Sequence, residues 1–576
     1  MAYLADLQRE VEFIIFDWLG DEDQETGQAV LDLSQRLAND MFAPHYRLGD
    51  THEPELVDGR VRVSQASKDA MAAYAELGLF GASFAPEIGG MDLSQLTVSA
   101  SYLMFAAANL STAAYIMLTA ANARVIATFA TPAQVEHFAG PQMEGRWFGT
   151  MCLSEPNAGS SLADITTRAT PDGSDGLGER YRVFGQKMWI SGGEQDISEN
   201  IVHLVLAKAV DSDGKVGSGT AGISLFLVPR ILPDGSPNDV VVAGLNHKLG
   251  YRGIPNCALN FGEGDLQPNG AAGAVGWRIG AEGEGLRQMF LMMNEARIGV
   301  SLGAAAVGYR AFRQSLTYAR ERVQGKPADS ERGGGNVAII DHPDVQRMLM
   351  QQKCYCEGAL ALTLYAAHLS ERKEEGLLSL LTPIVKSWSS AWTLRANDLA
   401  IQIHGGYGYT RDFDVELLWR DNRLNPIHEG TNGIQAIDLL ERKILRGDGV
   451  ATVELGSRIA ATAQRARQHQ DMADLAESLL TGWNRIQTTV QFLRGVERRQ
   501  RLFHASPFLD AMGHVVVAWL LLDQLLVNPK NDGIHMRAKK RACRWFFASE
   551  LPSISGWIAA MAMPELDELT SGIEEF

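Results

Sequence analysis

The sequence predicts a mixed α and β protein in which helical regions flank a small β domain. Apolar residues before position 150 recur mainly at helical spacing. Between about Met151 and Gly262 the apolar runs become short and rich in β-branched residues, and helical spacing returns after Gly285. A chain of 576 residues is also too long for one ordinary core. We therefore expect four regions: 1–149, helical; 150–272, β; 273–447, helical; and 448–576, an additional helical region.

The middle region carries five short apolar runs that we expect to be strands: residues 181–184, 201–207, 223–228, 240–242 and 257–261. Clusters of Gly, Asp, Ser and Pro separate them, as at 211–215 and 233–237. Such residues form tight turns, which join antiparallel strands. The pattern predicts a small antiparallel β domain.

One stretch, from Ser94 to Ala123, contains no charged residue and is long enough to cross a bilayer. Polar residues interrupt it, and the mean hydropathy of the chain is −0.09. We expect two buried helices that meet near residues 109–111, where Ser or Thr can cap the second one. The apolar run 515–522 is too short to span a membrane, so no membrane span is predicted.

The last region contains apolar residues at steps of three and four from Met472 to Leu493, which predicts one face of a long amphipathic helix. A glycine-rich segment at 330–336 predicts an exposed loop in the third region.

Composition excludes several classes of function. The formal charge of −17 disfavours nucleic acid as a partner, because nucleic-acid binders present a basic face to the phosphates. A polyanionic ligand would need a local basic pocket against this field. Five scattered cysteines fit a reducing compartment, and the C-x-C pair Cys354 and Cys356 lacks a second pair for a metal. The cysteine pattern therefore predicts no metal site. The first residues lack the order of a signal peptide, so we expect a soluble, cytoplasmic protein.

The most informative segment runs from Asn425 to Gln435 and contains a glutamate, Glu429, on a turn bounded by Pro426 and Gly430. A helix follows it, and the free amides of a helical first turn can bind an anion or a cofactor phosphate. Most single glutamates are solvated surface groups. The surrounding residues favour a catalytic role for this one.

Glu429-Gly-Thr-Asn-Gly-Ile-Gln435 resembles the base-bearing signature of the acyl-CoA dehydrogenase family, with His428 in place of its usual tyrosine. Residues 151–160, 186–193, 248–252, 294–297, 318–322 and 402–409 are similar to further family segments in the same order. The resemblance covers roughly residues 70–447. It implies a central barrel-like β domain and a four-helix bundle in the third region.

The resemblance implies FAD as the cofactor. Trp189 would lie against the flavin ring and Ser191 at its N5 edge, and Arg322 would meet the adenine-side phosphate. Gly405 and Gly406 would hold the FAD pyrophosphate of a neighbouring subunit, which implies at least a dimer. The full set of expected FAD contacts is Met151, Leu153, Ser154, Gly159, Ser160, Trp189, Ile190, Ser191, Arg322, Gln324, Gln402, Gly405, Gly406, Thr431 and Asn432.

The resemblance also implies an acyl-CoA substrate and an electron-transfer flavoprotein as acceptor. Expected substrate contacts are Ser160, Asn294, Arg297, Glu429 and Gly430. Asn294 stands where an acid is frequent, and Glu441 precedes Arg442 where the family often has the arginine one place earlier. Glu429 would remove the α-proton while the β-hydrogen leaves as hydride, giving a trans-2-enoyl-CoA.

The C-terminal extension is similar to the bacterial subgroup of 3-methylmercaptopropionyl-CoA dehydrogenase and broad-range fatty acyl-CoA dehydrogenases. Two alternatives stay open at this point, an acyl-CoA oxidase and a non-catalytic flavoprotein of the same fold. The sequence does not distinguish among the acyl groups used within this subgroup, because one methylene in an apolar pocket changes the binding free energy by only about 1–3 kcal/mol.

Overall fold

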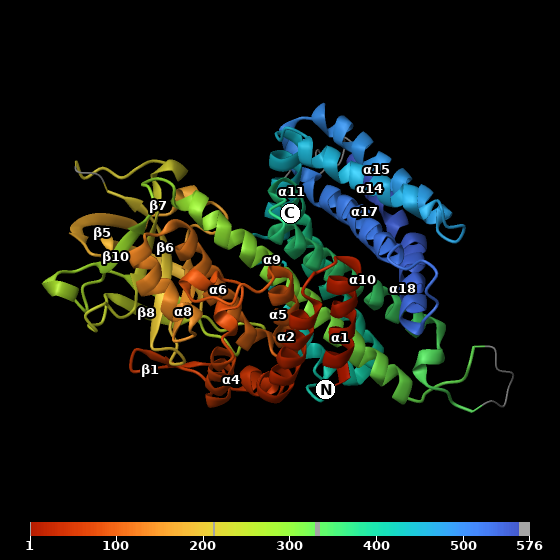
Figure 1. The fold of residues 1–576 in the computed structure, drawn as a ribbon, viewed down its shortest axis with the longest axis horizontal. Coiled ribbons are helices and arrows are strands. Elements are labelled where there is room, and N and C mark those ends of the chain that lie inside the picture. The colour runs from red at the N-terminus through yellow and green to blue at the C-terminus, as the bar shows by residue number, and fades with distance from the viewer. Residues whose placement is uncertain (1, 211–212, 329–334, 564–576) are drawn as a thin grey trace, which may run out of the picture. The chain divides into compact units, whose positions relative to one another are not determined.

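The computed structural model describes residues 2–210, 213–328 and 335–563 and divides the chain into two compact units. The β unit comprises residues 32–94 and 104–299, and the helical unit comprises the rest. Helix α9 (Gly285–Glu321) has its first fifteen positions in the β unit and the remainder in the helical unit. Figure 1 shows the strands of the β unit and the long helices of the helical unit.

The β unit is built around one eight-stranded sheet. Its strands are β3 (Trp147–Cys152), β4 (Arg168–Asp175), β5 (Gly178–Ser191), β6 (Asn200–Ala209), β7 (Ile223–Pro229), β8 (Val240–Leu245), β9 (Asn256–Phe261) and β10 (Ala274–Ile279). The order is β10-β7-β6-β4-β5-β9-β8, with β3 beside β6 and a further pairing of β10 with β5. This last pairing closes five strands into a ring, which confirms the barrel-like β domain.

All five expected strands are present, but three others were missed. β4 reads Arg-Ala-Thr-Pro-Asp-Gly-Ser-Asp, and its exposed polar residues resemble a turn. The expectation of antiparallel neighbours is wrong for β3 and β4, which pair with β6 in parallel. These parallel pairings join segments that are distant in sequence, so the turn residues between consecutive strands could not reveal them.

Helices cover the sheet and precede it. α5 (Gln95–Ala108) and α6 (Leu110–Phe129) are the two expected buried helices, and α6 packs on β3. The cap of α6 is Asn109, whose side chain accepts a hydrogen bond from the amide of Thr112 at 3.2 Å, so the expected Ser or Thr cap is wrong. The sequence also missed a hairpin of β1 (Glu55–Val57) and β2 (Arg60–Arg62), which precedes α4 (Gln65–Glu76).

The helical unit is built on a tightly packed pair, α10 (Pro343–Glu371) and α11 (Glu375–His404). Cys354 and Cys356 both lie in α10 and are buried. The unit begins with α1 (Ala2–Glu12) and α2 (Gln24–Leu37), the latter ending in the β unit. After α11 come α12 (Val415–Asn422), α13 (Asn432–Ile437) and the π-helical stretch η12 (Asp438–Leu445).

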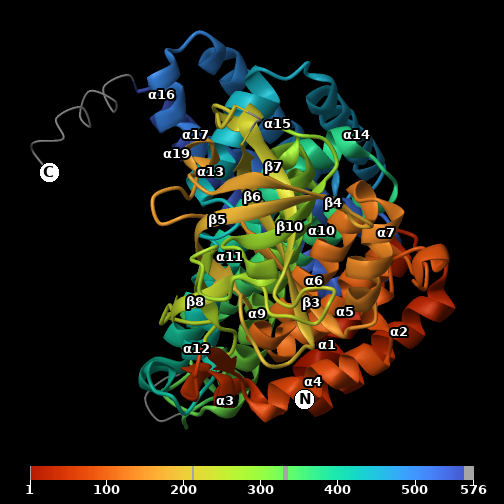
Figure 2. The same cartoon turned by 90° about the vertical axis from the view of Figure 1, so that its left-hand side faces the viewer.

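The C-terminal extension is helical, as predicted. It consists of α14 (Val450–Ala466), α15 (Ala473–Arg494), α16 (Arg498–Phe503), α17 (Ala505–Leu525), α18 (Ile534–Trp545) and α19 (Ile554–Met561). In α15 the residues that the helical spacing singled out are buried, among them Leu479, Trp483 and Ile486. α17 packs against α10, α11, α13 and α15, and Figure 2 shows α13, α15, α16 and α17 grouped together. The glycine-rich loop prediction falls mainly on residues 330–334, outside the described residues.

In the described part of the chain, α6 and α17 are long and apolar enough to cross a membrane by length and composition. From the sequence, the apolar run 515–522 was judged too short to cross a membrane. It is only the centre of the 21-residue helix α17, so the length of this helix was underestimated. In the most apolar windows of these helices, 78% and 83% of the residues are buried inside the protein. Such burial is typical of core helices in globular proteins.

A buried ion cluster ties the C-terminal extension to the start of the chain. The ammonium of Lys539 on α18 contacts the carboxylate of Glu10 on α1, and its Nζ lies 3.8 Å from Oε2 of Glu357 on α10. The Lys539 Nζ also donates to Gln524 Oε1 at 3.0 Å. Burial would raise the pKa of Glu357, but Lys353 and Lys539 outweigh burial and lower it. These contacts join α18 to α1, α10 and α17.

We predict that Lys539→Met lowers the free energy of unfolding by about 3–5 kcal/mol, because it leaves Glu10 buried without its cation. Urea unfolding monitored by circular dichroism measures the loss. Adding Glu10→Gln to this variant removes the stranded charge and should recover part of the stability. Equal unfolding midpoints for the single variant and the natural protein would contradict the prediction.

Candidate active site

Trp189 is the most unusual residue of the β unit. The register between β5 and β9 shifts between Lys187 and Ile190, and Trp189 lies in this bulge with φ +68°. This backbone conformation raises the free energy of the folded state by about 1–3 kcal/mol for a residue other than glycine. The side chain is nevertheless 62% exposed, so burial of the indole does not offset the cost. The fold presents a flat aromatic surface at the end of a strand.

A buried ion pair anchors this bulge. Lys187 Nζ lies 3.0 Å from Glu155 Oε1 and donates to the carbonyl oxygen of Leu153 at 3.0 Å, and both charged side chains are buried. The amide of Met188 donates to the carbonyl oxygen of Ser154 at 2.9 Å. These bonds join two of the segments that the sequence assigned to FAD.

Glu155 is stabilised as a carboxylate. It accepts hydrogen bonds from the amides and hydroxyls of Thr166 and Thr167 at 2.6–3.0 Å. Burial alone would raise its pKa, but Lys187 and these donors outweigh burial and hold the pKa of Glu155 at about 2. Burial lowers the pKa of Lys187 against the opposing effect of Glu155. Because Glu155 is already ionised well below neutral pH, its negative charge compensates the positive charge of Lys187 at neutral pH.

The remaining predicted FAD residues of this unit lie on the same two segments. Ile190 is buried, and Ser191 Oγ accepts a hydrogen bond from Asn256 Nδ2 at 3.3 Å, which leaves its proton for another acceptor. Met151 is half-buried at the end of β3. Gly159 and Ser160 are exposed just after the tight turn that the Glu155 and Ala158 bridge closes.

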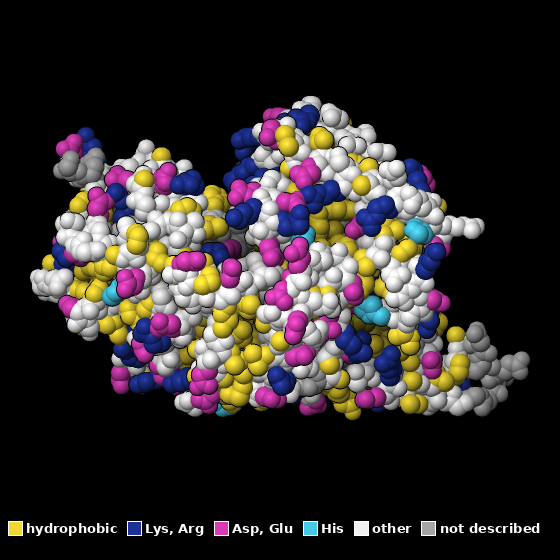
Figure 3. Space-filling view, viewed as in Figure 1, with side chains coloured by type: hydrophobic (Ala, Val, Ile, Leu, Met, Phe, Trp, Pro, Cys, Tyr) yellow, Lys and Arg dark blue, Asp and Glu magenta, His cyan; other side chains and the backbone are white. Residues whose placement is uncertain are grey.

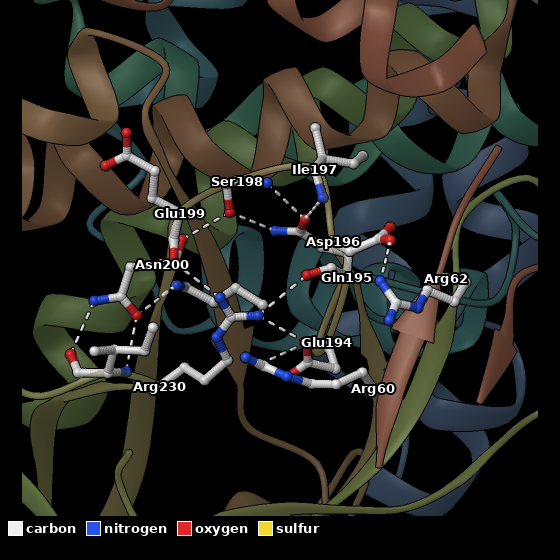
Figure 4. A network of polar contacts seen from close by, with 12 residues as sticks. Arg60, Arg62, Glu194, Gln195, Asp196, Ile197, Ser198, Glu199, Asn200 and Arg230 are labelled. Carbon is white, nitrogen blue, oxygen red and sulfur yellow. Dashed lines mark hydrogen bonds and ion pairs between the residues drawn. The ribbon is translucent and has the colours of Figure 1, made fainter. Parts of the chain in front are cut away.

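A polar network holds the loop that follows Ser191 (Figure 4). Arg230 Nη1 donates to Glu194 Oε1 at 2.7 Å, and Arg60 Nη1 approaches the same oxygen at 3.4 Å. Asp196 pairs with Lys68 at 2.7 Å and with Arg62 at 3.2 Å. Burial raises the pKa of Glu194 despite its two arginines. The hairpin β1–β2, which the sequence missed, thus anchors this loop.

The predicted substrate contacts on α9 are half-buried or buried. Arg297 is buried and its Nη1 donates to Asn294 Oδ1 at 3.3 Å, one turn earlier. Between them, Glu295 pairs with Arg124 at 2.8 Å, and burial raises its pKa to about 7 despite that arginine. Arg297 is therefore a fixed cation inside the protein.

In the helical unit, the predicted phosphate-binding residues lie at the ends of two packed helices. Arg322 Nη2 donates to Gln324 Oε1 at 3.0 Å, just after α9. The Tyr318 ring stacks on that of His404 at 4.3 Å between centroids, so the end of α9 packs on the end of α11. Gln402, Gly405 and Gly406 are exposed there, and Gly405 has φ +61°.

Glu429 also has a strained backbone. Its φ is +53°, followed by +86° at Gly430. Gln435 Nε2 donates to the Glu429 carbonyl oxygen at 3.0 Å, and Thr431 caps α13 by accepting from the Ile434 amide at 3.3 Å. The turn is therefore held from the following helix, and Glu429 itself is half-buried.

A buried lysine that the sequence missed lies under this turn. Lys386 is the one charged residue between Glu375 and Arg395, and this isolation in an otherwise uncharged segment could have indicated a buried lysine. Its side chain is fully buried in α11, and its Nζ donates to Asn432 Oδ1 at 3.2 Å. It supports the first residue of α13.

His428, next to Glu429 in the chain, heads a series of hydrogen-bonded buried amides. Its Nε2 lies 3.0 Å from Asn425 Oδ1, and Asn425 Nδ2 donates to Asn422 Oδ1 at 2.9 Å. Burial, followed by the charge of Lys386, lowers the pKa of His428 to about 3. The imidazole is therefore neutral at neutral pH and donates from Nε2. Among the described residues, no group of three His, Cys, Asp or Glu side chains could hold a metal ion.

Comparison with known proteins agrees with this architecture. Models of the acyl-CoA dehydrogenase N-terminal, middle and C-terminal domains match residues 25–146, 150–263 and 283–444. A model described as acetyl-CoA dehydrogenase C-terminal like matches residues 455–567, in the extension.

The chain is 32% identical to 3-methylmercaptopropionyl-CoA dehydrogenase of Ruegeria pomeroyi, over 86% of this chain and 84% of that one. It is 29% identical to a broad-specificity linear acyl-CoA dehydrogenase of Mycobacterium tuberculosis, over 92% and 91%. An acyl-CoA dehydrogenase of Bacillus anthracis, solved with FAD, has the same fold with a TM-score of 0.75 at 18% identity, over 94% and 90%.

The fold is that of a flavin-dependent dehydrogenase with a helical extension. The chain belongs to the acyl-CoA dehydrogenase family, and FAD is its cofactor. Each unit, taken by itself, contains residues suited to part of a flavin dinucleotide. The β unit has the exposed indole of Trp189, and the helical unit has the exposed Arg322 and the side-chain-free Gly405 and Gly406. The individual contacts remain predictions.

We predict that Lys187→Met weakens FAD retention and lowers the free energy of unfolding by about 3–5 kcal/mol, because Glu155 loses its buried cation. The absorbance of bound flavin after gel filtration and urea unfolding measure the two effects. Lys208→Met, at a half-buried lysine on β6, is the matched control. Full flavin content and unchanged stability in Lys187→Met would contradict the prediction.

We also predict that His428 contributes to acid lability. Its pKa is near 6.5 in the unfolded chain and about 3 in the fold, so below pH 6.5 the unfolded state binds more protons. Stability therefore falls as the pH drops from 6.5 toward 3, by about 1.4 kcal/mol per pH unit for this group. Urea unfolding at pH 7.5 and 5.5 should show a smaller loss in His428→Gln than in the natural protein. An identical loss in both would contradict this assignment.

Proposed function

We propose that this chain catalyses the α,β-dehydrogenation of an acyl-CoA thioester to the trans-2-enoyl-CoA, with Glu429 as the base. The observation that carries the proposal is the left-handed backbone at Glu429, φ +53°, in a turn held by Gln435 and a threonine-capped helix. Strained backbone that the surrounding structure over-determines is concentrated at functional sites. The matching of this turn to the family signature supports the same role.

The α-proton of a thioester is weakly acidic, so the base must be positioned and the carbonyl polarised. The carboxylate of Glu429 would accept the α-proton, and its backbone N–H would polarise the thioester carbonyl. The bound acyl chain would exclude water and raise the pKa of Glu429, making it a stronger base. When bound, FAD supplies the acceptor for the hydride from the β-carbon.

Residues of this chain would hold the cofactor and shield it from water. In the β unit, Trp189 would cover the ring with its exposed indole, and Ser191 would donate its free proton. Met151, Leu153, Ser154, Gly159, Ser160 and Ile190 complete this set. In the helical unit, Thr431 and Asn432 would contact the cofactor near the base, with Arg322, Gln324, Gln402, Gly405 and Gly406 toward its phosphates.

The exposed glycine loop also supports a dimer, because two aromatic side chains flank it in the open: Tyr407 is 49% exposed and Tyr409 is 90% exposed. We propose a cytoplasmic homodimer that passes electrons to an electron-transfer flavoprotein. The named relatives support a fatty acyl-CoA or 3-methylmercaptopropionyl-CoA as substrate.

We predict that Glu429→Gln keeps bound, yellow FAD but loses flavin bleaching by substrate, because the amide cannot accept the α-proton. Anaerobic absorbance titration with short, medium, branched and methylthio acyl-CoAs measures this and identifies the substrate class. The matched control, Glu477→Gln, changes an exposed carboxylate of α15 and should bleach normally.

Full bleaching of Glu429→Gln would overturn the assignment of the base. Bound flavin that no thioester bleaches in the natural protein would overturn the proposed reaction. Rapid reoxidation of the reduced natural protein by air would point to an oxidase.

A further inference from the structure

A line of polar side chains, which we call the polar stripe, runs along one face of α11. Its members Lys386, Ser390, Thr393 and Asn397 follow one another at steps of four, three and four residues, which places them on the same side of the helix. All four are buried, whereas many Lys, Arg, Asp and Glu side chains lie in the open on the face of the protein in Figure 3. Buried polar groups destabilise a fold unless they are hydrogen-bonded, so the polar stripe needs partners.

The first half of the polar stripe holds the segment that follows the proposed base. Lys386 Nζ donates to Asn432 Oδ1 at 3.2 Å, and Ser390 Oγ lies 3.4 Å from the same oxygen. The main-chain amide of Asn432 donates to the carbonyl oxygen of Pro426 at 3.1 Å. This bond closes a loop from Pro426 to Asn432, which we call the base loop because Glu429 is its middle residue.

The second half of the polar stripe holds the segment that precedes the base, through the last residue of α12. Asn422 Nδ2 donates to Asn397 Oδ1 at 2.5 Å and to Thr393 Oγ1 at 3.1 Å. Asn425 Nδ2 donates to Asn422 Oδ1 at 2.9 Å, and Asn425 Oδ1 lies 3.0 Å from His428 Nε2. We call Asn397, Asn422, Asn425 and His428 the amide relay. It connects the polar stripe to the base loop.

A main-chain oxygen sets the direction of the amide relay. Asn397 Nδ2 donates to the carbonyl oxygen of Val307 on α9 at 3.4 Å. A carbonyl oxygen can only accept, so Asn397 presents its own oxygen to Asn422, and the next amide is oriented in the same way. The final acceptor is Asn425 Oδ1, so Nε2 of His428 has to carry a proton. The contact with α9 therefore fixes the tautomer of His428.

The amide relay reaches α9 because α9 and α11 approach each other closely. Gly308 follows Val307, and a Cβ at this glycine would lie 2.7 Å from Thr393 Cβ. Carbon atoms in a packed core do not come so close without displacing one another. The missing side chain at Gly308 therefore permits the contact between α9 and the polar stripe.

We propose that the polar stripe and the amide relay position the base loop for catalysis, with Asn422 and His428 as positioning residues. The inference rests on the proposed function, because it takes Glu429 as the base. Misplacing a reacting group by about 1 Å can slow a reaction about a hundredfold. The left-handed backbone at Glu429 raises the free energy of the fold, and bonds on both sides of this residue hold it in place.

The variants Asn422→Leu and His428→Leu each remove one member of the amide relay. Anaerobic stopped-flow bleaching of bound FAD, by the thioester that reduces the natural protein fastest, gives a maximum rate and a half-saturating concentration. We expect the maximum rate to fall about tenfold or more in both variants, because the base is displaced. The half-saturating concentration should stay within about twofold, since misplacing the base affects the transition state more than substrate binding.

Two further variants and a control separate positioning from a general loss of stability. His428→Gln keeps an N–H donor for Asn425 and should recover most of the rate that His428→Leu loses. The double variant Asn422→Leu/His428→Leu should be no slower than His428→Leu, because Asn422 acts through His428. Gln352→Met is the matched control. It removes a buried amide of α10 that donates to the carbonyl oxygen of Ala396 at 2.7 Å, and it should bleach at the natural rate.

Bleaching of Asn422→Leu and His428→Leu at the natural rate would overturn the proposal. An equal loss in Gln352→Met, or losses that multiply in the double variant, would also overturn it, because the substitutions would then act independently of the amide relay. If Asn422→Leu does not fold, equal losses in His428→Leu and His428→Gln decide against the proposal. Failure of the proposed function appears differently, as an absence of bleaching of the natural protein by any thioester, and it removes the reaction that the base loop would serve.

Discussion

The β-unit part of the site depends on the ion pair of Lys187 and Glu155. Removing both charges from water costs several kcal/mol per ion, and attraction offsets this only where every remaining polar atom is satisfied. That condition is met here, since Glu155 accepts from two threonines and Lys187 also donates to a backbone carbonyl. The pair fixes the bulge in which Trp189 stands exposed with a left-handed backbone.

The helical unit repeats this arrangement with different residues. Glu429 also has a left-handed backbone, and a fully buried lysine, Lys386, lies beneath its turn and bonds Asn432. A third buried lysine, Lys539, joins α18 to α1 and α10. Lysine suits these places because its long stem reaches through an apolar layer and its ammonium offers three donors. In each of these three places a buried lysine bonds to a polar side chain of another segment.

The acidity of the chain has a structural consequence for its ligand. A surface that is negative overall repels a polyanion, so affinity has to come from places where the field is locally reversed. Arg297 on α9 is one such place, a buried cation inside the protein.

Several features followed from the sequence because they depend on local chemistry. Strands rich in β-branched residues between turn signals, the spacing of α15, and the Pro- and Gly-bounded turn of Glu429 all lie within short windows. β4 and the hairpin β1–β2 escaped notice, because their polar sequences resemble turns and their strand character comes from their partners.

The sequence by itself determined the order of helical and β regions, the family, and the residue expected to act as base. Only the tertiary structure decided which strands pair in parallel, which lysines are buried, and which asparagines connect α11 to His428. The physical reason is distance along the chain. Contacts between residues dozens to hundreds of positions apart depend on how whole elements pack, and no local pattern of residue types encodes that packing.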